Sequence, residues 1–307
     1  MIVLDRLTKR YDATIAVDQL SLTVAAGSIC VLVGASGCGK STTLRLINRL
    51  IEPDGGRVLI GGTDVASLPA VALRRRIGYV IQSIGLFPHW TIARNIATVP
   101  ELLGWPAERI ARRVDELLDL VGLDPDSYRD RRPHELSGGQ QQRVGVARAL
   151  AADPDLLLMD EPFGALDPVT RDGLQAALLD IQARTGKTVI LVTHDIDEAI
   201  RLASRIAVLD DGRLIQQGSP REILTRPANR FVESFIGGPR LGLRLLQVTS
   251  VGERTDYEAS AEGEPIAADA PLDMALARMV ASGTDRLAVV DAAGRRGALA
   301  LADVVAR

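Results

Sequence analysis

The stretch Gly34-Ala35-Ser36-Gly37-Cys38-Gly39-Lys40-Ser41 decides the fold, because it fits the pattern G-x-x-x-x-G-K-[ST]. The apolar run Ile29–Val33 before it predicts a strand, and the pattern from Lys40 to Leu50 after it predicts a helix. In this context, glycines let backbone N–H groups converge on phosphate oxygens, at a helix end whose dipole favours anions. We therefore expect Lys40 to reach the β- and γ-phosphates of a nucleotide and Ser41 to ligate Mg²⁺; a turn that binds nothing is the alternative.

Two acids farther along the chain would complete such a site. Leu156–Asp160 is predicted to be a buried strand, which would hold the Asp160 carboxylate near the Mg²⁺. Glu161 follows directly, where it could polarise an attacking water. Two acids at a strand end are often only a solvated turn, but the phosphate loop favours the catalytic interpretation.

A second glycine-rich motif, Leu136-Ser137-Gly138-Gly139-Gln140, lies between the phosphate loop and the two acids. The Ser137 hydroxyl and the bare amides of the glycine pair open a predicted helix, so they form another anion-binding end. Ser137 is also expected to cap this helix, but a cap alone does not explain the glycine pair. The motif suggests a nucleotide site finished by another subunit, and so an ATP-driven clamp rather than a simple kinase or GTPase.

The order of apolar runs predicts an α/β fold with a mostly parallel sheet around a P-loop NTPase core. Residues 91–150 carry helical spacing and no strand pattern, so they are expected to form a helical insert. We expect residues 1–237 to form the nucleotide-binding domain and residues 240–307 to form a small α+β unit. The expected core strands are Ile29–Val33, Ile77–Ile81, Leu156–Asp160, Val189–Thr193 and Arg205–Leu209, followed by a hairpin to Arg213–Gln216; Ile2–Leu7, Leu20–Val24 and Arg57–Ile60 are expected to form an N-terminal antiparallel β-subdomain.

Composition narrows the kinds of partner and the compartment. The formal charge of −3 and the pI of about 5.7 give no basic footprint for nucleic acid. No apolar run approaches the roughly 18 residues that a membrane span requires. The only two cysteines, Cys30 and Cys38, lie in an apolar strand and in the phosphate loop, so no disulfide is expected. These features favour a cytosolic protein with reduced thiols.

With these motifs in place, the chain resembles an ATP-binding-cassette (ABC) ATPase over residues 1 to about 237, and Leu136–Gln140 is similar to that family's signature. The resemblance implies ATP hydrolysis with Mg²⁺ by two nucleotide domains that pair head to tail, and a homodimer is expected. Ser137 and the Gly138-Gly139 amides would then cap the γ-phosphate held by the other copy. It also implies a peripheral place on the cytoplasmic face of the membrane, with integral membrane permease subunits and an extracytoplasmic solute-binding protein as partners.

Four more positions take roles from the same resemblance. Gln82 resembles the glutamine that reaches Mg²⁺ and water, and His194 the switch histidine that contacts the γ-phosphate. Asp167 resembles the dimer-contact aspartate, and Tyr11 the aromatic that stacks on adenine, with plain packing as the alternative for Tyr11. The catalytic residues are then expected to be Lys40, Gln82, Glu161 and His194, the Mg²⁺ ligands Ser41, Gln82 and Asp160, and the nucleotide-binding residues Tyr11, Gly34, Ala35, Ser36, Gly37, Cys38, Gly39, Lys40, Ser41, Thr42, Ser137, Gly138, Gly139, Gln140 and Asp167.

Closer resemblance concerns the cargo and the tail. Ile47–Pro53, Ile77–Gln82 and Ile84–Thr91 are similar to ATPases that import quaternary-amine osmoprotectants such as glycine betaine, choline and carnitine. Importers of amino acids or polyamines share most of these runs. A soluble cassette ATPase of DNA repair or translation, or a module that binds nucleotide without hydrolysis, are alternatives of another class. Residues 266–307 resemble one CBS-type motif, which implies a regulatory or dimerisation role.

Overall fold

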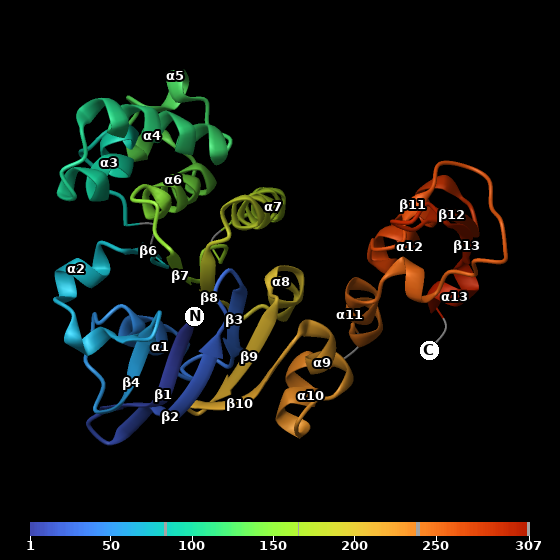
Figure 1. Cartoon of the computed structure of the whole chain (residues 1–307), viewed down its shortest axis with the longest axis horizontal. Coiled ribbons are helices and arrows are strands. Elements are labelled where there is room, and N and C mark those ends of the chain that lie inside the picture. Colours follow the sequence, from blue (N-terminus) through green and yellow to red (C-terminus); the bar gives the residue numbers. More distant parts are fainter. Residues whose placement is uncertain (83–84, 165, 238–239, 306–307) are drawn as a thin grey trace. The chain divides into compact units, whose positions relative to one another are not determined.

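The computed structural model describes residues 1–82, 85–164, 166–237 and 240–305 (Figure 1). They belong to two compact units, Met1–Gln217 and Gly218–Arg307. Ile84, the first residue of one run that resembles osmoprotectant importers, lies outside the described residues, as do residues 238–239 at the expected domain boundary.

The first unit is built on a six-stranded sheet in the order β10-β9-β3-β8-β7-β6. Strands β9, β3, β8, β7 and β6 pair in parallel, which confirms the expected mostly parallel core. A tight turn at Asp211-Gly212 then brings in the edge strand β10. The strands are β3 (Ile29–Gly34), β6 (Ile77–Val80), β7 (Leu156–Asp160), β8 (Thr188–Val192), β9 (Arg205–Asp210) and β10 (Arg213–Gly218).

The register of the parallel strands brings their carboxyl ends level. Val192 of β8 pairs with Leu32 of β3 on one side and with Asp160 of β7 on the other. The segments that leave these strands therefore emerge at one edge of the sheet, which is where open α/β sheets bind ligands. The phosphate loop leaves β3, Glu161 leaves β7 and His194 follows β8 at this edge.

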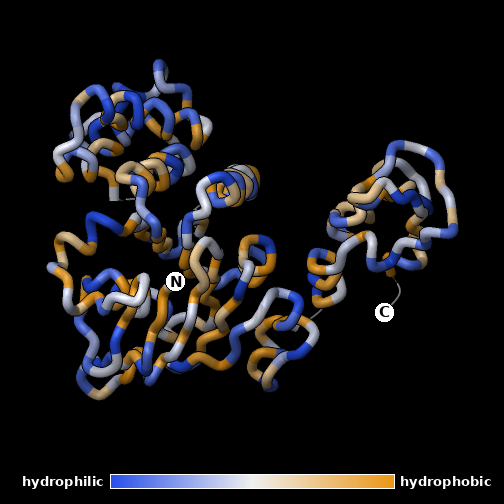
Figure 2. Tube along the Cα trace, in the orientation of Figure 1, coloured by the Kyte–Doolittle hydropathy of each residue, from blue (hydrophilic) through white to orange (hydrophobic). Residues whose placement is uncertain are grey.

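Strands β3, β7 and β8 are buried along their whole length, which explains why the sequence shows continuous apolar runs there. Figure 2 shows the same concentration of apolar residues along the central strands. Helices α1 (Lys40–Ile47), α7 (Pro168–Thr185) and α8 (Ile196–Leu202) follow β3, β7 and β8 in the chain. In the part of the chain that the structure describes, no helix combines the length and the apolar character needed to cross a bilayer.

A second, antiparallel sheet in the order β2-β1-β4-β5 confirms the expected N-terminal β-subdomain. Strands β1 and β2 run beyond the apolar stretches that predicted them, because their pairing continues through register shifts near Leu7. The elements are β1 (Ile2–Tyr11), β2 (Thr14–Val24), β4 (Gly55–Ile60) and β5 (Thr63–Asp64), followed by the short helices η1 (Val65–Ser67) and α2 (Ala70–Arg74).

The stretch expected to be a helical insert is helical. Val114, Leu117 and Leu118 form the buried face of α4, as their spacing predicted, and α3, α4 and α6 pack against one another (Figure 1). The insert contains α3 (Ile92–Leu102), α4 (Ala107–Leu120), α5 (Pro125–Tyr128), η2 (Pro133–Glu135) and α6 (Gly138–Leu150).

The second unit has its own apolar core, which includes Val251, Leu272, Val289 and Leu299. Its small sheet has the order β11-β12-β13, so the expected α+β character is present. The resemblance to a CBS-type motif stays a prediction. Its elements are α9 (Pro220–Thr225), α10 (Arg230–Ile236), α11 (Leu241–Val248), η3 (Val251–Glu253), β11 (Ile266–Ala267), α12 (Leu272–Ser282), β12 (Arg286–Val290), β13 (Arg296–Ala300) and α13 (Leu301–Val305).

The boundary between the two compact units lies between Gln217 and Gly218, which is earlier in the chain than the expected boundary at residues 237–240. Helix α9 packs against both α10 and α11, so it joins the second unit. The sequence did not show this because the composition changes only after α10. The functional division at 237–240 stays a prediction.

Candidate functional site

The phosphate loop closes around the Lys40 side chain. Lys40 is buried, and its Nζ donates hydrogen bonds to the carbonyl oxygens of Gly34 and Ala35, each at 2.8 Å. The same Nζ lies 3.6 Å from the Cys38 Sγ. The loop therefore holds a cation at its centre, which is the charge that a phosphate group needs.

Two glycines of this loop leave no room for a side chain. Gly39 has φ of 97°, and a Cβ there would lie 2.2 Å from the carbonyl oxygen of Ala16. A Cβ on Gly34 would lie 2.1 Å from the carbonyl oxygen of Leu209. Only glycine can adopt these backbone positions without moving β2 or β9 away.

Helix α1 begins directly at the loop, with Gly39 as its N-cap and no side chain capping its first turn. The first amides of a helix have no partner within the helix, so those of Lys40, Ser41 and Thr42 can donate to an anion. The amide of Thr43 is the first that bonds back, to the carbonyl oxygen of Gly39 at 2.8 Å.

Ser41 and Asp160 lie together at the ends of α1 and β7. The Ser41 hydroxyl donates a hydrogen bond of 2.8 Å to the Asp160 Oδ1. Burial raises the pKa of the Asp160 carboxyl, while the hydrogen bond from Ser41 opposes that shift. A hydroxyl and a buried carboxylate in contact make an oxygen donor set, which suits Mg²⁺.

Glu161 is held between residues that leave two neighbouring strands. Its Oε2 accepts a hydrogen bond of 3.3 Å from the Gln82 side-chain amide, and its Oε1 lies 3.4 Å from the His194 Nδ1. Its backbone is also fixed, because its N–H donates to the Val192 carbonyl oxygen at 3.0 Å. Glu161 has φ of 46°, a left-handed conformation that costs a non-glycine residue roughly 1–3 kcal/mol. Strain of this kind often marks a functional position.

These groups surround one pocket of about 490 Å³. The structure thus brings together the phosphate loop, the start of α1, and Glu161 with the two residues that contact it, Gln82 and His194. The pocket is lined by Ser36, Gly37, Gly39, Lys40, Ser41, Thr42, Gln82, Glu161 and His194.

The signature motif forms the predicted helix cap but lies outside the walls of this pocket. The Ser137 hydroxyl accepts from the Gln140 amide at 3.3 Å, and the Gln140 side chain accepts in return from the Ser137 amide at 2.9 Å. A Cβ on Gly138 would meet nothing within 4 Å, whereas one on Gly139 would lie 2.4 Å from the Thr170 Cγ2. Gly139 is therefore needed for packing against α7, and Gly138 is not needed by its own chain.

Asp167 and Tyr11 also lie outside the pocket walls. Asp167 caps α7 by accepting from the Thr170 amide at 3.1 Å, and hydrogen bonds from Thr170 hold the pKa of the Asp167 carboxyl below its ordinary value. Tyr11 ends β1 with 44% of its surface exposed, so it is not a core residue. The Lys9 Nζ lies 5.6 Å from the centre of its ring.

Both cysteines are free and buried. Burial raises the pKa of the Cys30 thiol to about 12. Burial also raises the pKa of the Cys38 thiol, although the nearby Lys40 ammonium opposes the shift. Both side chains are therefore protonated thiols near neutral pH, and the Cys38 thiol packs inside the phosphate loop.

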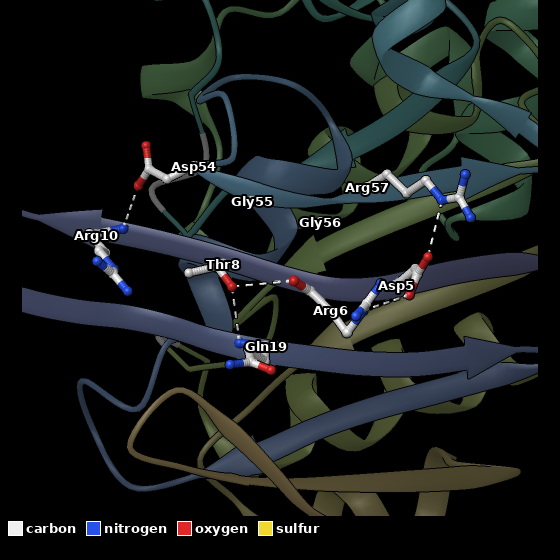
Figure 3. Close-up of a pocket in the computed structure, with 9 residues that line it drawn as sticks. All are labelled: Asp5, Arg6, Thr8, Arg10, Gln19, Asp54, Gly55, Gly56 and Arg57. Atoms are coloured by element: carbon white, nitrogen blue, oxygen red, sulfur yellow. Dashed lines mark hydrogen bonds and ion pairs between the residues drawn. The ribbon is translucent and has the colours of Figure 1, made fainter.

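A larger and more open pocket, of about 770 Å³, lies on the antiparallel sheet (Figure 3). Its polar groups are largely bonded to one another: Arg57 Nε lies 3.1 Å from Asp5 Oδ2, and the Thr8 hydroxyl bridges the Arg6 carbonyl oxygen and the Gln19 amide. No residue expected for nucleotide chemistry lines it. Its size alone therefore does not make it the active site.

Sequence reasoning missed several charged residues that contact the site. The Arg45 guanidinium lies near both Tyr79 and Asp160, where it lowers the pKa of each group against the effect of burial. Arg171 and Glu198 lie close to the segments that carry Asp167 and His194. Helical spacing from the known motifs was the only signal that could have placed them, and it does not say which charges meet across two helices.

This chain is similar to known proteins in sequence, and the similarity identifies its family. A family model described as ABC transporter matches residues 17–164. The glycine betaine uptake system ATP-binding protein YehX of Escherichia coli (strain K12) is 54% identical over 295 residues, which cover 96% of this chain and 96% of that protein. The glycine betaine/carnitine/choline transport ATP-binding protein OpuCA of Bacillus subtilis (strain 168) is 51% identical over 292 residues, which cover 95% of this chain and 76% of that protein.

Solved structures show the same architecture. The dimeric post-hydrolysis state of the ATP-binding cassette MJ0796 bound to ADP and Pi is similar with a TM-score of 0.65 and 34% sequence identity. The match covers 71% of this chain and 98% of that one.

Proposed function

Because the chain belongs to the ABC transporter family, we propose that it is the ATP-hydrolysing subunit of an importer of quaternary-amine osmoprotectants. The observation that supports hydrolysis is that Gln82 and His194 both contact the Glu161 carboxylate, at the wall of the pocket formed by the phosphate loop. A pocket that only bound nucleotide would not need a fixed and strained carboxylate beside the phosphates.

In the proposed reaction, a water attacks the γ-phosphorus in line with the bond that breaks to ADP. Glu161 orients and polarises that water, and Gln82 and His194 keep its carboxylate aimed at the pocket. Lys40 and the first amides of α1 stabilise the negative charge on the phosphate oxygens. A phosphate oxygen is a much better acceptor for Lys40 than the Cys38 sulfur at 3.6 Å, so the ammonium would exchange that contact for the nucleotide.

We assign Mg²⁺ to Ser41 and Asp160, with the Gln82 side-chain oxygen as a further ligand. The contact of 2.8 Å between Ser41 and Asp160 places two hard oxygen donors together, as this ion requires. When bound with ATP, the ion would neutralise charge on the β- and γ-phosphates.

Two copies are proposed to pair head to tail. The solved relative MJ0796 is described as dimeric with ADP and Pi. Ser137 and the amide at Gly138 would donate to the γ-phosphate in the pocket of the other copy, and the open space around Gly138 would admit that phosphate closely. Asp167 would contact the other copy beside this point, and Tyr11 would stack on the adenine through its exposed face.

The cargo assignment rests on the relatives. YehX is named for glycine betaine uptake and OpuCA for transport of glycine betaine, carnitine and choline, and both matches include the second unit of this chain. Permease subunits in the membrane and an extracytoplasmic solute-binding protein would complete the importer. The chain would then work on the cytoplasmic face of the membrane, held there by the permease.

Replacing Glu161 tests the proposal directly. Glu161→Gln keeps size and hydrogen bonding but removes the charge, so hydrolysis should fall by about 100- to 1000-fold. ATP should still bind, and an ATP-dependent dimer should accumulate in light scattering. Phosphate release and binding of labelled ATP are measured beside Glu116→Gln, a control at an exposed carboxylate on α4. Undiminished turnover in Glu161→Gln would reject the assigned role.

A further inference from the structure

Two residues that flank His194 are fixed by one buried carboxylate. The Thr193 hydroxyl donates a hydrogen bond of 2.6 Å to Glu198 Oε2, and the Asp195 amide donates to the Thr193 oxygen at 3.0 Å. The Glu198 side chain is only 7% exposed, and burial raises the pKa of its carboxyl. Glu198, on α8, therefore sets the position of the turn from which His194 reaches Glu161.

Arg171, on α7, connects this turn to the segment that carries Asp167. Its Nη2 donates to the Leu166 carbonyl oxygen at 3.2 Å, one residue before Asp167. Its Nε lies 3.9 Å from Glu198 Oε1, and its Nη1 lies 4.0 Å from Asp195 Oδ2. One guanidinium thus faces both segments.

The contact between Arg171 and Glu198 is close but not yet a hydrogen bond. A separation of 3.9 Å exceeds the range of N–H···O bonds, and Arg171 Nε is buried with no hydrogen-bond partner among the described residues. A buried donor without a partner is unfavourable, so a movement of about 1 Å that paired it would be stabilising. Such a movement would shift the Asp167 segment and the His194 turn together.

We propose that Arg171 and Glu198 are positioning residues that couple the Asp167 segment to His194. This inference rests on the proposed function, in which Asp167 meets the second copy. When the second copy presses on the Asp167 segment, Arg171 closes onto Glu198 and shortens the contact of 3.4 Å between His194 and Glu161. Hydrolysis in one pocket then depends on the arrival of the partner, although neither Arg171 nor Glu198 touches the nucleotide.

A neighbouring arginine provides a matched comparison. Arg201, on α8, also bridges to α7, with Nη1 at 2.6 Å from Asp172 Oδ1 and 3.1 Å from Gln175 Oε1. It joins the same two helices but contacts neither the Leu166–Asp167 segment nor the His194 turn in the interactions described above. Loss of Arg201 therefore tests whether joining α7 to α8 is sufficient.

The experiment is a double-mutant cycle of Arg171→Met and Glu198→Gln in the full chain, with Arg201→Met as the control. Each single change should lower kcat about tenfold while the KM for ATP stays within about twofold. The double variant should be no slower than the slower single variant, because both changes break one coupling. Arg201→Met should keep kcat within about twofold of the native value.

Three further measurements separate positioning from folding. The chain has three histidines, so the ring signals of His194 can be followed by NMR. Because His194 lines the pocket, ATP binding should shift these signals in every variant. The further shift that accompanies pairing of two copies should appear in native protein and in Arg201→Met but not in Arg171→Met. Arg171→Lys, which keeps the charge, should recover part of the lost kcat. Thermal unfolding and ATP binding identify any variant that fails to fold, and Arg171→Lys then takes the place of Arg171→Met in the cycle.

The coupling would be overturned by any of three results. Arg171→Met could keep the native kcat, the double variant could lose kcat by the product of the two single losses, or Arg201→Met could lose as much kcat as Arg171→Met. The proposed function would survive these results as long as native protein hydrolyses ATP and Glu161→Gln does not. If Glu161→Gln hydrolyses ATP normally, the proposed function itself fails, so the two failures are distinguishable.

Discussion

The phosphate loop and the signature motif are both glycine-rich segments that open a helix, yet their surroundings differ. A side chain on Gly39 would collide with Ala16 at 2.2 Å, so β2 of the same chain requires that glycine. A side chain on Gly138 would meet nothing within 4 Å. The first glycine is explained by the fold of one chain, and the second is not.

The comparison shows how each half of the proposed shared site can be recognised. Lys40, Ser41 and Glu161 are each fixed by contacts within the chain, so this half is complete. Ser137 is bonded to Gln140 of its own helix, while the space around Gly138 stays open. A glycine that its own chain does not need permits another molecule to approach the backbone closely, and Gly138 directly follows the Ser137 hydroxyl at the start of a helix.

The largest effect is expected in the complete half. Lys40→Ala removes the cation at the centre of the phosphate loop, so hydrolysis should fall by about 100-fold or more. Binding of a fluorescent ATP analogue should weaken in monomeric protein as well, because this half does not depend on the partner. Native affinity and turnover in Lys40→Ala would remove this residue from the site.

Alanine at the two contrasting glycines should break the comparison or sharpen it. Gly39→Ala, at φ of 97°, should destabilise the fold by roughly 2 kcal/mol or more. Gly138→Ala should instead stabilise the fold by about 0.5–1 kcal/mol, because alanine is the better helix residue. Hydrolysis at saturating ATP should nevertheless fall about tenfold or more in Gly138→Ala, because the added methyl group holds the two copies apart.

Denaturant unfolding and ATPase assays on both variants check this prediction. An equal loss of stability in Gly39→Ala and Gly138→Ala would mean that the fold of the chain requires both glycines alike. Full activity in Gly138→Ala would mean that nothing approaches the signature motif closely.

A smaller effect is expected when the signature hydroxyl is removed. Ser137→Ala removes a helix cap, so the free energy of unfolding should fall by about 1 kcal/mol. The loss of one donor to a charged phosphate should also lower kcat about tenfold, and this part should appear only at protein concentrations that allow pairing. Steady-state kinetics over a range of protein concentrations separates the two effects; a loss of activity that is independent of concentration would contradict it.

The smallest effect concerns the pH dependence of stability and can be measured on a single copy. Burial raises the pKa of Glu198 above its unfolded value of about 4.3, so the folded chain binds its proton more tightly. The stability that this group contributes is full below that value and is lost as pH rises through the folded pKa. The unfolding free energy of native protein relative to Glu198→Gln should therefore fall from about pH 4 upward, in urea titrations at low protein concentration. A difference that grows with pH would contradict the assignment.

Much of the fold and of the pocket could be predicted from the sequence. The short motifs lie next to segments whose apolar residues follow clear strand or helix spacing, so each motif could be placed on an element. The ABC family resemblance is confirmed by the relatives, and the parallel core, the antiparallel subdomain and the helical insert are confirmed by the structure. The gathering of Gln82, Glu161 and His194 follows from parallel strands that end level, although the roles of Gln82 and His194 came from resemblance. Those roles stay proposals.

What the sequence could not give are the contacts across helices and the start of the second unit. Arg171 and Glu198 meet because α7 and α8 pack at a particular angle, and helical spacing within one segment does not fix that angle. Helix α9 joins the second unit because of its packing on α10 and α11, which leaves no mark in composition. The left-handed backbone of Glu161 is also invisible in the sequence, because the residue type gives no warning of it.

Because Glu161 has a left-handed backbone, a change at this position that raises stability can abolish turnover. Glycine would occupy φ of 46° without the cost that glutamate bears there, so Glu161→Gly relieves strain and removes the carboxylate in one step. A library selected only for heat resistance would therefore be drawn toward inactive molecules at this position. Screens for hardier variants need an activity filter at every round.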